Sequence, residues 1–226
     1  MEETAAWLQK TFAYQFQDSS LLEEALTHRS VGRRNNERLE FLGDAVLDFV
    51  VSAMVFEKRP QADEGDLSRL RASLVRDVRL AEIAATFGLG DHLILGSGEM
   101  KSGGHRRGSI QADALEAIFG AIYIDAGFPA ANEVIRRVFR SLVDELPDSE
   151  ELKDPKTRLQ EYLQGRGYAL PVYQMEKVSG LAHKQSFEVS CCVDELTLGS
   201  MGRGTTRRDA EQEAAARMLT QIEKAK

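Results

Sequence analysis

The sequence predicts two domains, an all-α domain followed by a small α+β domain with the element order α-β-β-β-α. Up to about residue 145, apolar residues recur at three- and four-residue spacing, and no segment alternates with a period of two. After an acidic, proline-containing stretch, β-branched residues alternate as they do in strands. The 226 residues are enough for two modest domains. We place the all-α domain at residues 1–146, a linker at 147–153 and the α+β domain at 154–226.

The first domain shows helical periodicity in several segments separated by polar stretches. These segments are 21–26, 38–56, 67–87, 110–124 and 131–146. In the second domain, Asp154 suits the N-cap and Pro155 the first position of a helix over 155–164. Further on we expect strands at 172–178, 186–193 and 195–199, and a last helix at 206–223.

The composition excludes several classes of protein. Hydrophobic residues make up 42% and charged residues 29%, which excludes wholesale disorder. The longest apolar stretch, 45–56, contains Asp48 and is shorter than the ~20 residues of a membrane helix, so no membrane association is expected. The acidic N-terminus lacks the features of a signal peptide. The adjacent Cys191 and Cys192 cannot build a disulfide framework, which favours the reducing cytoplasm.

The net charge of −7 is unevenly distributed. Residues 1–150 hold 17 Lys and Arg against 25 Asp and Glu, whereas residues 151–226 hold 12 against 11. Taken alone, an acidic protein is a poor partner for a polyanion. The acidic excess of the first domain therefore needs a cause.

The segment 36–48 gives one helix an acidic face and an apolar face. At about 100° per residue, the acidic side chains fall within roughly a quarter turn: Glu37, Glu40, Asp44 and Asp48. The expected apolar face holds Leu39, Leu42, Val46, Phe49 and Val50. Like charges at these spacings destabilise a helix unless positive charge lies against them. A solvated acidic face with arginine partners is one interpretation, and a metal site is the other.

A second pair of carboxylates favours the metal site. Asp113 and Glu116 are three residues apart on a segment that is apolar nearly all round and should be buried. Unpaired buried charge is very costly, and Glu40 and Asp44 cannot neutralise it, whereas a divalent cation can neutralise all four groups. Oxygen ligands without His or Cys favour Mg²⁺ or Mn²⁺ over zinc. Such a site activates water and stabilises charge on a phosphodiester.

Two further charged segments have simpler interpretations. In 64–66, Asp66 suits a helix N-cap and Glu64 favours the helix dipole, although this explains Glu64 only in part. The glycine-rich segment 96–107 lacks the spacing of a nucleotide-binding loop and is interpreted as a flexible surface loop. Its basic residues suit contacts with a phosphate backbone: Lys101, Arg106 and Arg107.

The longest motif in the chain is Glu37-Arg38-Leu39-Glu40-Phe41-Leu42-Gly43-Asp44-Ala45-Val46-Leu47. Around it stand Thr27-His28-Arg29-Ser30, Glu64-Gly65-Asp66-Leu67-Ser68 and Asp113-Ala114-Leu115-Glu116-Ala117. Together these motifs resemble the ribonuclease III family in residues and in order. The resemblance covers essentially the whole chain.

This resemblance implies a helical endonuclease domain that works as a homodimer. It implies Mg²⁺, which Mn²⁺ can replace, and no organic cofactor. The family's metal-binding and catalytic carboxylates fall on four positions, all filled here: Glu40, Asp44, Asp113 and Glu116. Glu37 and Glu64 match further acidic residues of the family's cleavage valley, and Phe41 matches the dimer-interface aromatic that inserts into the partner subunit.

The second domain carries a resemblance of its own. Its motifs are Asp154-Pro155-Lys156-Thr157-Arg158-Leu159-Gln160-Glu161 at the start and Gly202-Arg203-Gly204-Thr205-Thr206-Arg207-Arg208 near the end. They resemble a double-stranded-RNA-binding domain, which recognises the A-form shape over ~16 base pairs. Glu211 stands where many such domains carry lysine, so we expect modest, salt-sensitive affinity.

The expected RNA contacts follow from that resemblance and from simple electrostatics. Arg207 and Arg208 at a helix N-terminus offer free N–H groups and positive charge to phosphates. Residues of the first helix suit the shallow minor groove: Thr157, Gln160 and Glu161. His183, between the first two strands, suits a second minor groove.

The resemblance implies a cytoplasmic, bacterial-type enzyme that hydrolyses double-stranded RNA to 5′-phosphate and 3′-hydroxyl ends with short 3′ overhangs. The substrates that it implies are ribosomal-RNA precursors and structured messenger RNAs. An alternative from another class is a non-catalytic duplex-RNA-binding protein, against which the repulsion between carboxylates and phosphates argues. A hydrolase of small phosphates is disfavoured by the second domain. Whether one or two metals bind at each site stays open.

Overall fold

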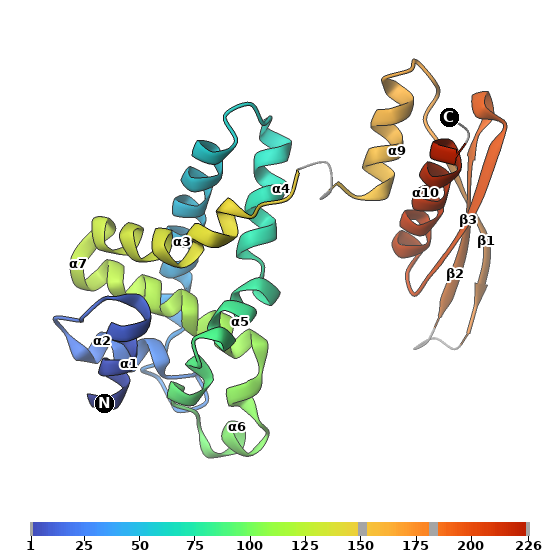
Figure 1. Ribbon diagram of the computed structural model, residues 1–226. Helices are drawn as coiled ribbons and strands as arrows, with labels where there is room; N and C mark the ends of the chain where they lie inside the picture. Colours follow the sequence, from blue (N-terminus) through green and yellow to red (C-terminus); the bar gives the residue numbers. More distant parts are fainter. Residues whose placement is uncertain (1, 149–152, 181–184, 225–226) are drawn as a thin grey trace. The chain divides into compact units, whose positions relative to one another are not determined.

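The computed structural model describes residues 2–148, 153–180 and 185–224. The chain forms two compact units, Met1–Ser149 and Glu150–Lys226 (Figure 1). The first is helical, and the second combines helices with a three-stranded sheet. The predicted fold class is therefore confirmed. Of the predicted linker, residues 149–152 lie outside the described residues.

The helices of the first unit differ from the expected segments at two breaks. They are α1 (Glu2–Phe12), α2 (Ser19–Leu26), α3 (Glu37–Lys58), α4 (Glu64–Val75), α5 (Asp77–Thr86), α6 (Ser97–Lys101) and α7 (Gly108–Asp144). The expected helix 67–87 is two helices, because Arg76 adopts extended backbone between α4 and α5. The segments 110–124 and 131–146 join in α7, which is kinked at Gly127, where φ is 77°.

Helix α3 has three faces rather than two. Its buried face includes Leu39, Val46 and Val50, as expected. Phe49 was expected there too, and that prediction was wrong, since this side chain is 63% exposed. On a helical wheel the buried face lies about a quarter turn from the acidic residues, not opposite them. The third face is therefore an outward apolar stripe, on which Phe49 contacts Phe128 edge-on at 5.5 Å.

The two central helices α3 and α7 cross (Figure 1), and they are in contact at Gly43 and Gly120. A Cβ added at Gly43 would overlap the Glu116 carbonyl oxygen, and one added at Gly120 would overlap the Leu39 carbonyl oxygen. The two backbones thus touch directly, which is possible only because both residues lack side chains. This contact sets the separation of the helices that carry the candidate carboxylates.

The second unit has the predicted order of elements. They are α9 (Pro155–Gln164), β1 (Val172–Ser179), β2 (Ser186–Val193), β3 (Leu198–Gly204) and α10 (Arg207–Lys224). The antiparallel sheet has the order β1-β2-β3, and both helices pack on one of its faces (Figure 1). Asp154 caps α9 by accepting hydrogen bonds from the N–H groups of Lys156 and Thr157, as its sequence predicted.

The strand predicted at 195–199 was wrong. Residues Asp194–Leu196 form a 3-10 turn, Thr197 has φ 50°, and β3 then continues to Gly204. The strand was not recognised in the sequence because it contains Gly202 and Gly204, and glycine is uncommon in strands. Both glycines are required because α10 packs against β3 so closely that a Cβ at Gly202 would overlap the Ala210 carbonyl oxygen.

By length and composition alone, α7 could cross a membrane. Half of its most apolar window is buried within the first unit, which is typical of the central helix of a globular domain. Its buried side chains include Leu115, Ile118 and Phe119. The apolar character of α7 is thus accounted for by packing.

Replacing Gly43 by alanine should destabilise the first unit by about 1–3 kcal/mol, because the added methyl group forces α3 and α7 apart. Guanidinium chloride unfolding followed by circular dichroism measures the change. Gly98→Ala is the matched control, since a Cβ there meets no atom within 4 Å. Equal stability of Gly43→Ala and the wild type would contradict the backbone contact.

Candidate active site and RNA-binding face

Helices α3 and α7 bring carboxylates from two distant parts of the chain together. Glu40 and Asp44 flank Gly43 on α3, and Asp113 and Glu116 precede Gly120 on α7. Because the helices touch at these glycines, the two pairs of acidic residues lie across the crossing. The carboxylates influence one another electrostatically, as their pKa values show.

Burial and mutual repulsion disfavour ionisation of these carboxylates. Burial raises the pKa of Glu116 to about 8, with repulsion from Asp44, Glu40 and Asp113 acting in the same direction. The pKa of Glu40 is also raised, first by burial and then by repulsion from Asp113. Burial raises the pKa of Asp44 and that of Asp113. The arrangement is unfavourable without positive charge, which is typical of a site rather than of a structural ion pair.

A polar pocket of about 450 Å³ opens beside these carboxylates. Glu37, Glu40 and Asp113 line it, whereas Asp44 and Glu116 lie outside its lining. It also has basic residues: His28, Arg29 and Arg107. Arg29 lies 3.7 Å from Glu37, with both side chains more than half exposed. His28 and Arg29 belong to the motif at 27–30, but their place in this pocket was not predicted from the sequence.

The donor set fits a hard divalent cation in kind and in charge. Carboxylate oxygens are the ligands that Mg²⁺ and Mn²⁺ prefer. The pKa of Glu116 is raised by burial and by repulsion from Asp44, Glu40 and Asp113, so a cation beside these groups would be favourable. Within the described residues, however, no three acidic, His or Cys side chains are close enough to form a ready-made coordination shell. Binding of a cation would therefore have to draw the side chains inward.

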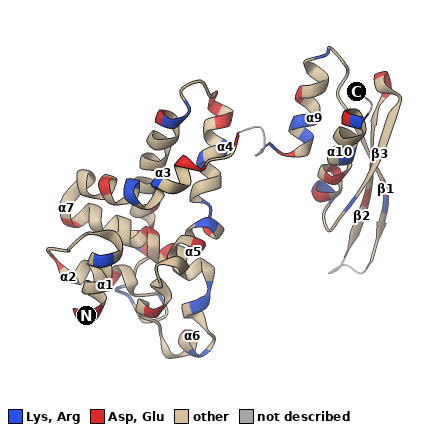
Figure 2. Ribbon diagram, in the orientation of Figure 1, with Lys and Arg blue, Asp and Glu red and all other residues tan. Residues whose placement is uncertain are grey.

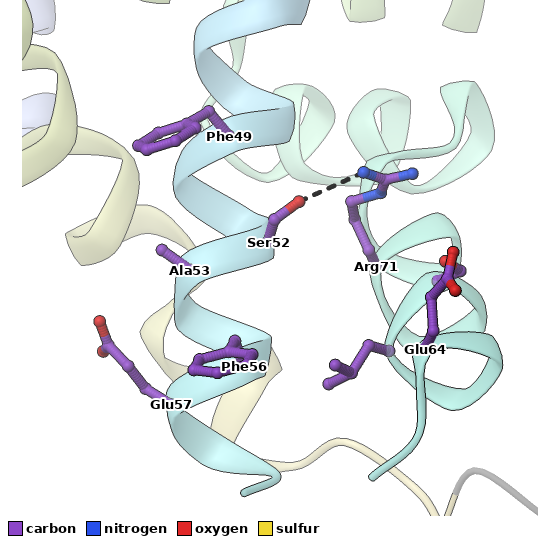
Figure 3. A pocket seen from close by; sticks show the side chains of 9 residues that line it. Phe49, Ser52, Ala53, Phe56, Glu57, Glu64 and Arg71 are labelled. Atoms are coloured by element: carbon purple, nitrogen blue, oxygen red, sulfur yellow. Dashed lines mark hydrogen bonds between the residues drawn. The ribbon is translucent and has the colours of Figure 1, made fainter.

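Glu64 lies away from the other acidic residues of its own chain. It is the first residue of α4 and lines a different cavity, of about 360 Å³, between α3 and α4 (Figure 3). The expected N-cap was also misplaced by three residues. Asp63 caps α4, accepting a hydrogen bond from the Asp66 N–H at 2.7 Å, while Asp66 pairs with Arg69.

The cavity between α3 and α4 is largely apolar. Phe49 and Phe56 of α3 border it, and the Arg71 side chain of α4 reaches across to donate a hydrogen bond to the Ser52 hydroxyl at 3.3 Å (Figure 3). Phe41 lies two turns before Phe49 on α3 and is 79% exposed. Phe41, Phe49 and Phe56 thus form an outward aromatic stripe on α3, which we call the α3 stripe.

The glycine-rich segment is more ordered than a flexible loop. It contains α6 and a 3-10 turn at Gly104–Arg106, and the Gln111 side chain donates a hydrogen bond to the His105 carbonyl oxygen at 2.8 Å. Lys101 and Arg106 are exposed. Arg107 pairs with Glu99 at 2.8 Å on the rim of the carboxylate pocket.

In the second unit, Arg207 and Arg208 begin α10, whereas Thr157, Gln160 and Glu161 lie along α9. The two helices are joined by a hydrogen bond from the Gln212 side chain to Asp154 at 2.8 Å. The surface formed by Thr157, Gln160, Glu161, Arg207 and Arg208 is called the α9–α10 face. His183 lies outside the described residues.

The ion pairs that Glu211 forms on the α9–α10 face were not predicted from the sequence. Glu211 accepts a hydrogen bond from Lys156 at 2.6 Å and another from Arg207 at 2.8 Å, which lowers its pKa. The Lys156 ammonium also lies 4.6 Å from the centre of the Tyr173 ring. Basic and acidic residues are interspersed on both helices (Figure 2). The spacing of Arg207 and Glu211, four residues apart on a helix, was the available signal.

Known proteins share both units. Residues 18–142 match the Ribonuclease-III-like family and residues 155–222 the double-stranded RNA binding motif. The chain is 51% identical to Ribonuclease 3 of Actinobacillus pleuropneumoniae serotype 5b over 95% of this chain and 96% of that protein. It is 53% identical to Ribonuclease 3 of Aromatoleum aromaticum over 96% of each chain. The chain belongs to the ribonuclease III family.

A solved structure supports the same assignment for the first unit. The nuclease domain of ribonuclease III from Campylobacter jejuni is 47% identical, with a TM-score of 0.58 over 60% of this chain and 95% of that chain. Its description mentions a region involved in dimer formation. As a member of the ribonuclease III family, the chain is an enzyme with a nuclease unit and a double-stranded-RNA-binding unit. The recognition of the family from its motifs is confirmed.

The raised pKa of Glu116 predicts a pH-dependent stability in the absence of metal. The folded state favours the protonated carboxyl, so its stabilising effect is complete below the ordinary pKa of 4.5 and is lost as the pH rises to about 8. Glu116→Gln cannot ionise and should raise the Tm of the EDTA-treated protein at the upper end of this window. Thermal unfolding across the window measures this difference.

The matched control for this variant is Glu133→Gln, on the same helix but in an exposed pair with Arg137. It should leave the pH dependence of the Tm unchanged. A Glu116→Gln variant that melts at or below the wild-type Tm at the upper end of the window would show that Glu116 is not electrostatically strained.

Proposed function

We propose that the chain is a divalent-metal-dependent endonuclease that hydrolyses double-stranded RNA to 5′-phosphate and 3′-hydroxyl ends. The observation that carries the proposal is the pairing of carboxylates across the α3–α7 crossing, with the pKa of Glu116 raised to about 8. The double-stranded RNA binding motif at residues 155–222 supports the substrate class. Short 3′ overhangs follow if two sites cut opposite strands.

Each carboxylate has a role in this reaction. Glu40, Asp113 and Glu116 would hold the cation, which supplies positive charge at the phosphate and a polarised water. Asp44 would orient the attacking water and take up its proton, a role suited to a carboxylate whose pKa is raised by burial. Attack at phosphorus breaks the bond to the 3′ oxygen, which leaves as a hydroxyl after protonation. The cation would be Mg²⁺ or Mn²⁺.

The α9–α10 face supplies the duplex contacts in this proposal. Arg208 and Lys101 are exposed basic groups for phosphates, one in each unit. Thr157 and Gln160 suit the minor groove of an A-form duplex. We also propose His183 as a contact with a second groove. Because Glu211 already pairs with Lys156 and Arg207, affinity should be modest and should fall steeply with salt.

A homodimer accounts for the α3 stripe. Three exposed phenylalanines on one helix form an unusual apolar surface for a monomer. The chain also contains a cavity for such a side chain, between α3 and α4. In a two-fold dimer with antiparallel α3 helices, Phe41 of each copy would enter the cavity of the other, so that both contacts form at once.

The same dimer gives Glu64 a place in the site. Glu64 lines the cavity that would receive Phe41 of the second copy. Since Phe41 is adjacent to Glu40 in sequence, insertion would bring Glu64 of one copy towards the carboxylates of the other. Glu37, exposed at the start of α3, would border the same valley. This explains why Glu64 stands apart from the other acidic residues within one chain.

A non-catalytic duplex-RNA-binding protein remains the second candidate. The α9–α10 face alone would serve it, but Glu40, Asp44, Asp113 and Glu116 would then repel the ligand without any compensating benefit. For the proposed nuclease, ribosomal-RNA precursors and structured messenger RNAs are the substrates, and the reducing cytoplasm is the compartment. Cys191 and Cys192 are free thiols, as that compartment favours.

Incubation of a long, perfect RNA duplex with the protein tests the proposed activity. Mg²⁺ should yield short duplexes with 5′-phosphate ends, whereas EDTA should yield none. Asp44→Asn and Glu116→Gln should each lower the cleavage rate by about 10³-fold or more, because both residues belong to the proposed metal site. Both variants should still bind the duplex on native gels. Glu133→Gln is the matched control that should cleave normally. Wild-type protein that shifts the duplex without cutting it would favour the binding-only candidate.

Phe41→Asp tests the dimer. The variant should fold normally, since the side chain is 79% exposed, but should sediment as a monomer because a carboxylate cannot enter an apolar cavity. Analytical ultracentrifugation measures the mass, and cleavage should fall with it. Val78→Asp, at another exposed apolar position on α5, should leave the mass unchanged. A wild type that is monomeric at micromolar concentration would rule the interface out.

A further inference from the structure

The segment 27–30 is held firmly at the edge of the carboxylate pocket, and the proposed function leaves it without a role. The His28 N–H donates a hydrogen bond to the Ile94 carbonyl oxygen at 2.9 Å. Gly96 packs so closely that a Cβ there would overlap the Ser30 carbonyl oxygen. These contacts hold the backbone of the segment 27–30 in place, and His28 lines the pocket together with Glu37, Glu40 and Asp113.

The hydrogen bonds define the tautomer of His28. The Ser30 N–H lies 3.2 Å from His28 Nδ1, and because an N–H group only donates, Nδ1 must accept. Ser30 Oγ lies 2.8 Å from the same nitrogen. This hydroxyl accepts a hydrogen bond from the Gly96 N–H at 2.9 Å, which leaves its own proton to donate to Nδ1. The ring proton therefore resides on Nε2.

The Nε2–H group of His28 is the donor of the pocket that is left for a ligand. Arg29 faces Glu37 at 3.7 Å and Arg107 faces Glu99 at 2.8 Å. In the part of the chain that the structure describes, no hydrogen bond to His28 Nε2 is found. His28 and Asp113 line the same pocket. A ligand in the pocket therefore meets a fixed N–H donor beside the carboxylates.

We propose that His28 is a further catalytic residue, whose Nε2–H donates a hydrogen bond to a non-bridging oxygen of the scissile phosphate. Ser30 is then a positioning residue, which holds the proton on Nε2 by donating twice to Nδ1. The inference rests on the proposed nuclease function, because it names the group that the pocket offers to the RNA. No proton is transferred by His28 in this role.

The chemistry of the pocket calls for such a donor. The carboxylates that would hold the cation repel the phosphate, and negative charge builds up on the non-bridging oxygens as water attacks. A fixed N–H donor strengthens its hydrogen bond as that charge develops, so it favours the transition state over the bound substrate. A donor whose tautomer is already set needs no reorganisation at that moment.

Single-turnover cleavage of a duplex RNA in Mg²⁺ tests His28 directly. His28→Ala should lower the cleavage rate on the order of 100-fold, as does loss of one donor to a developing anion elsewhere. Duplex affinity, measured in Ca²⁺, should not change, because other residues supply the binding. His28→Gln restores an amide N–H at nearly the same reach and should recover a large part of the rate.

Ser30→Ala tests the positioning role. It should lower the rate roughly 3- to 10-fold, the equivalent of one ordinary hydrogen bond. In the His28→Ala background it should have no further effect, because the positioning role of Ser30 acts on the His28 ring. Ser141→Ala, on the exposed surface of α7, is the matched control and should cleave at the wild-type rate.

Nitrogen-15 NMR of the metal-free protein gives a readout that is independent of activity. The His28 imidazole should show its proton on Nε2 at mildly alkaline pH, and Ser30→Ala should mix the two tautomers. This measurement decides the tautomer even if His28→Ala fails to fold. A wild-type spectrum with the proton on Nδ1 overturns the inference.

The kinetic outcomes separate this inference from the proposed function. A His28→Ala variant as fast as an active wild type overturns the role of His28 alone. A wild type that leaves the duplex intact in Mg²⁺ overturns the nuclease function and the role of His28 with it. A rate loss in His28→Ala that His28→Gln does not relieve at all also overturns the donor role.

Discussion

The direct backbone contact between Gly43 and Gly120 is the constraint on which the first unit depends. It costs helix propensity, about 1 kcal/mol for each glycine relative to alanine. In return, two helices approach more closely than side chains would allow, and their carboxylates come within electrostatic range. The pKa of Glu116 is raised to about 8, first by burial and then by repulsion from these neighbouring carboxylates. The two glycines, which lower helix stability, thus lie at the candidate site. This is expected where function requires a locally unfavourable sequence.

Helix α3 contributes to the fold, to the site and to the proposed assembly, because each of its three faces has a different role. One face packs in the core through residues such as Val46 and Val50. The acidic face borders the core rather than opposing it, which is why Glu40 is partly buried and its pKa is raised. The third face carries the α3 stripe, which includes Phe41 and Phe49 and leaves apolar surface in water. A change in the rotation of this helix would disturb all three faces together.

Much of this structure could be predicted from the sequence, because periodicity reports which residues are buried and motifs report chemistry. The fold class, the cap of α9 and the position of Asp113 and Glu116 on a buried helix followed in that way. The errors have physical causes. Phe49 was predicted to be a core residue because hydrophobicity does not distinguish a core from an interface. The end of β3 was missed because its glycines have low strand propensity and are required by the close packing of α10. Hydrogen bonds that bridge distant segments, such as those from the His28 N–H to Ile94 and from Lys156 to Glu211, leave no periodic trace.

An acidic enzyme that acts on a polyanion must attract the RNA with residues other than its catalytic carboxylates, which repel phosphates. In the proposed function, the second unit and a few basic groups supply attraction, yet Glu211 already occupies Lys156 and Arg207 there. Affinity from that unit is therefore limited, and the repulsion by the carboxylates of the first unit is relieved only when a cation binds. By linkage, a cation that favours RNA binding must itself be bound more tightly when RNA is present. The mutual repulsion of Glu116 and the neighbouring carboxylates would thus couple the two binding steps, so that bound metal strengthens duplex binding and bound duplex strengthens metal binding.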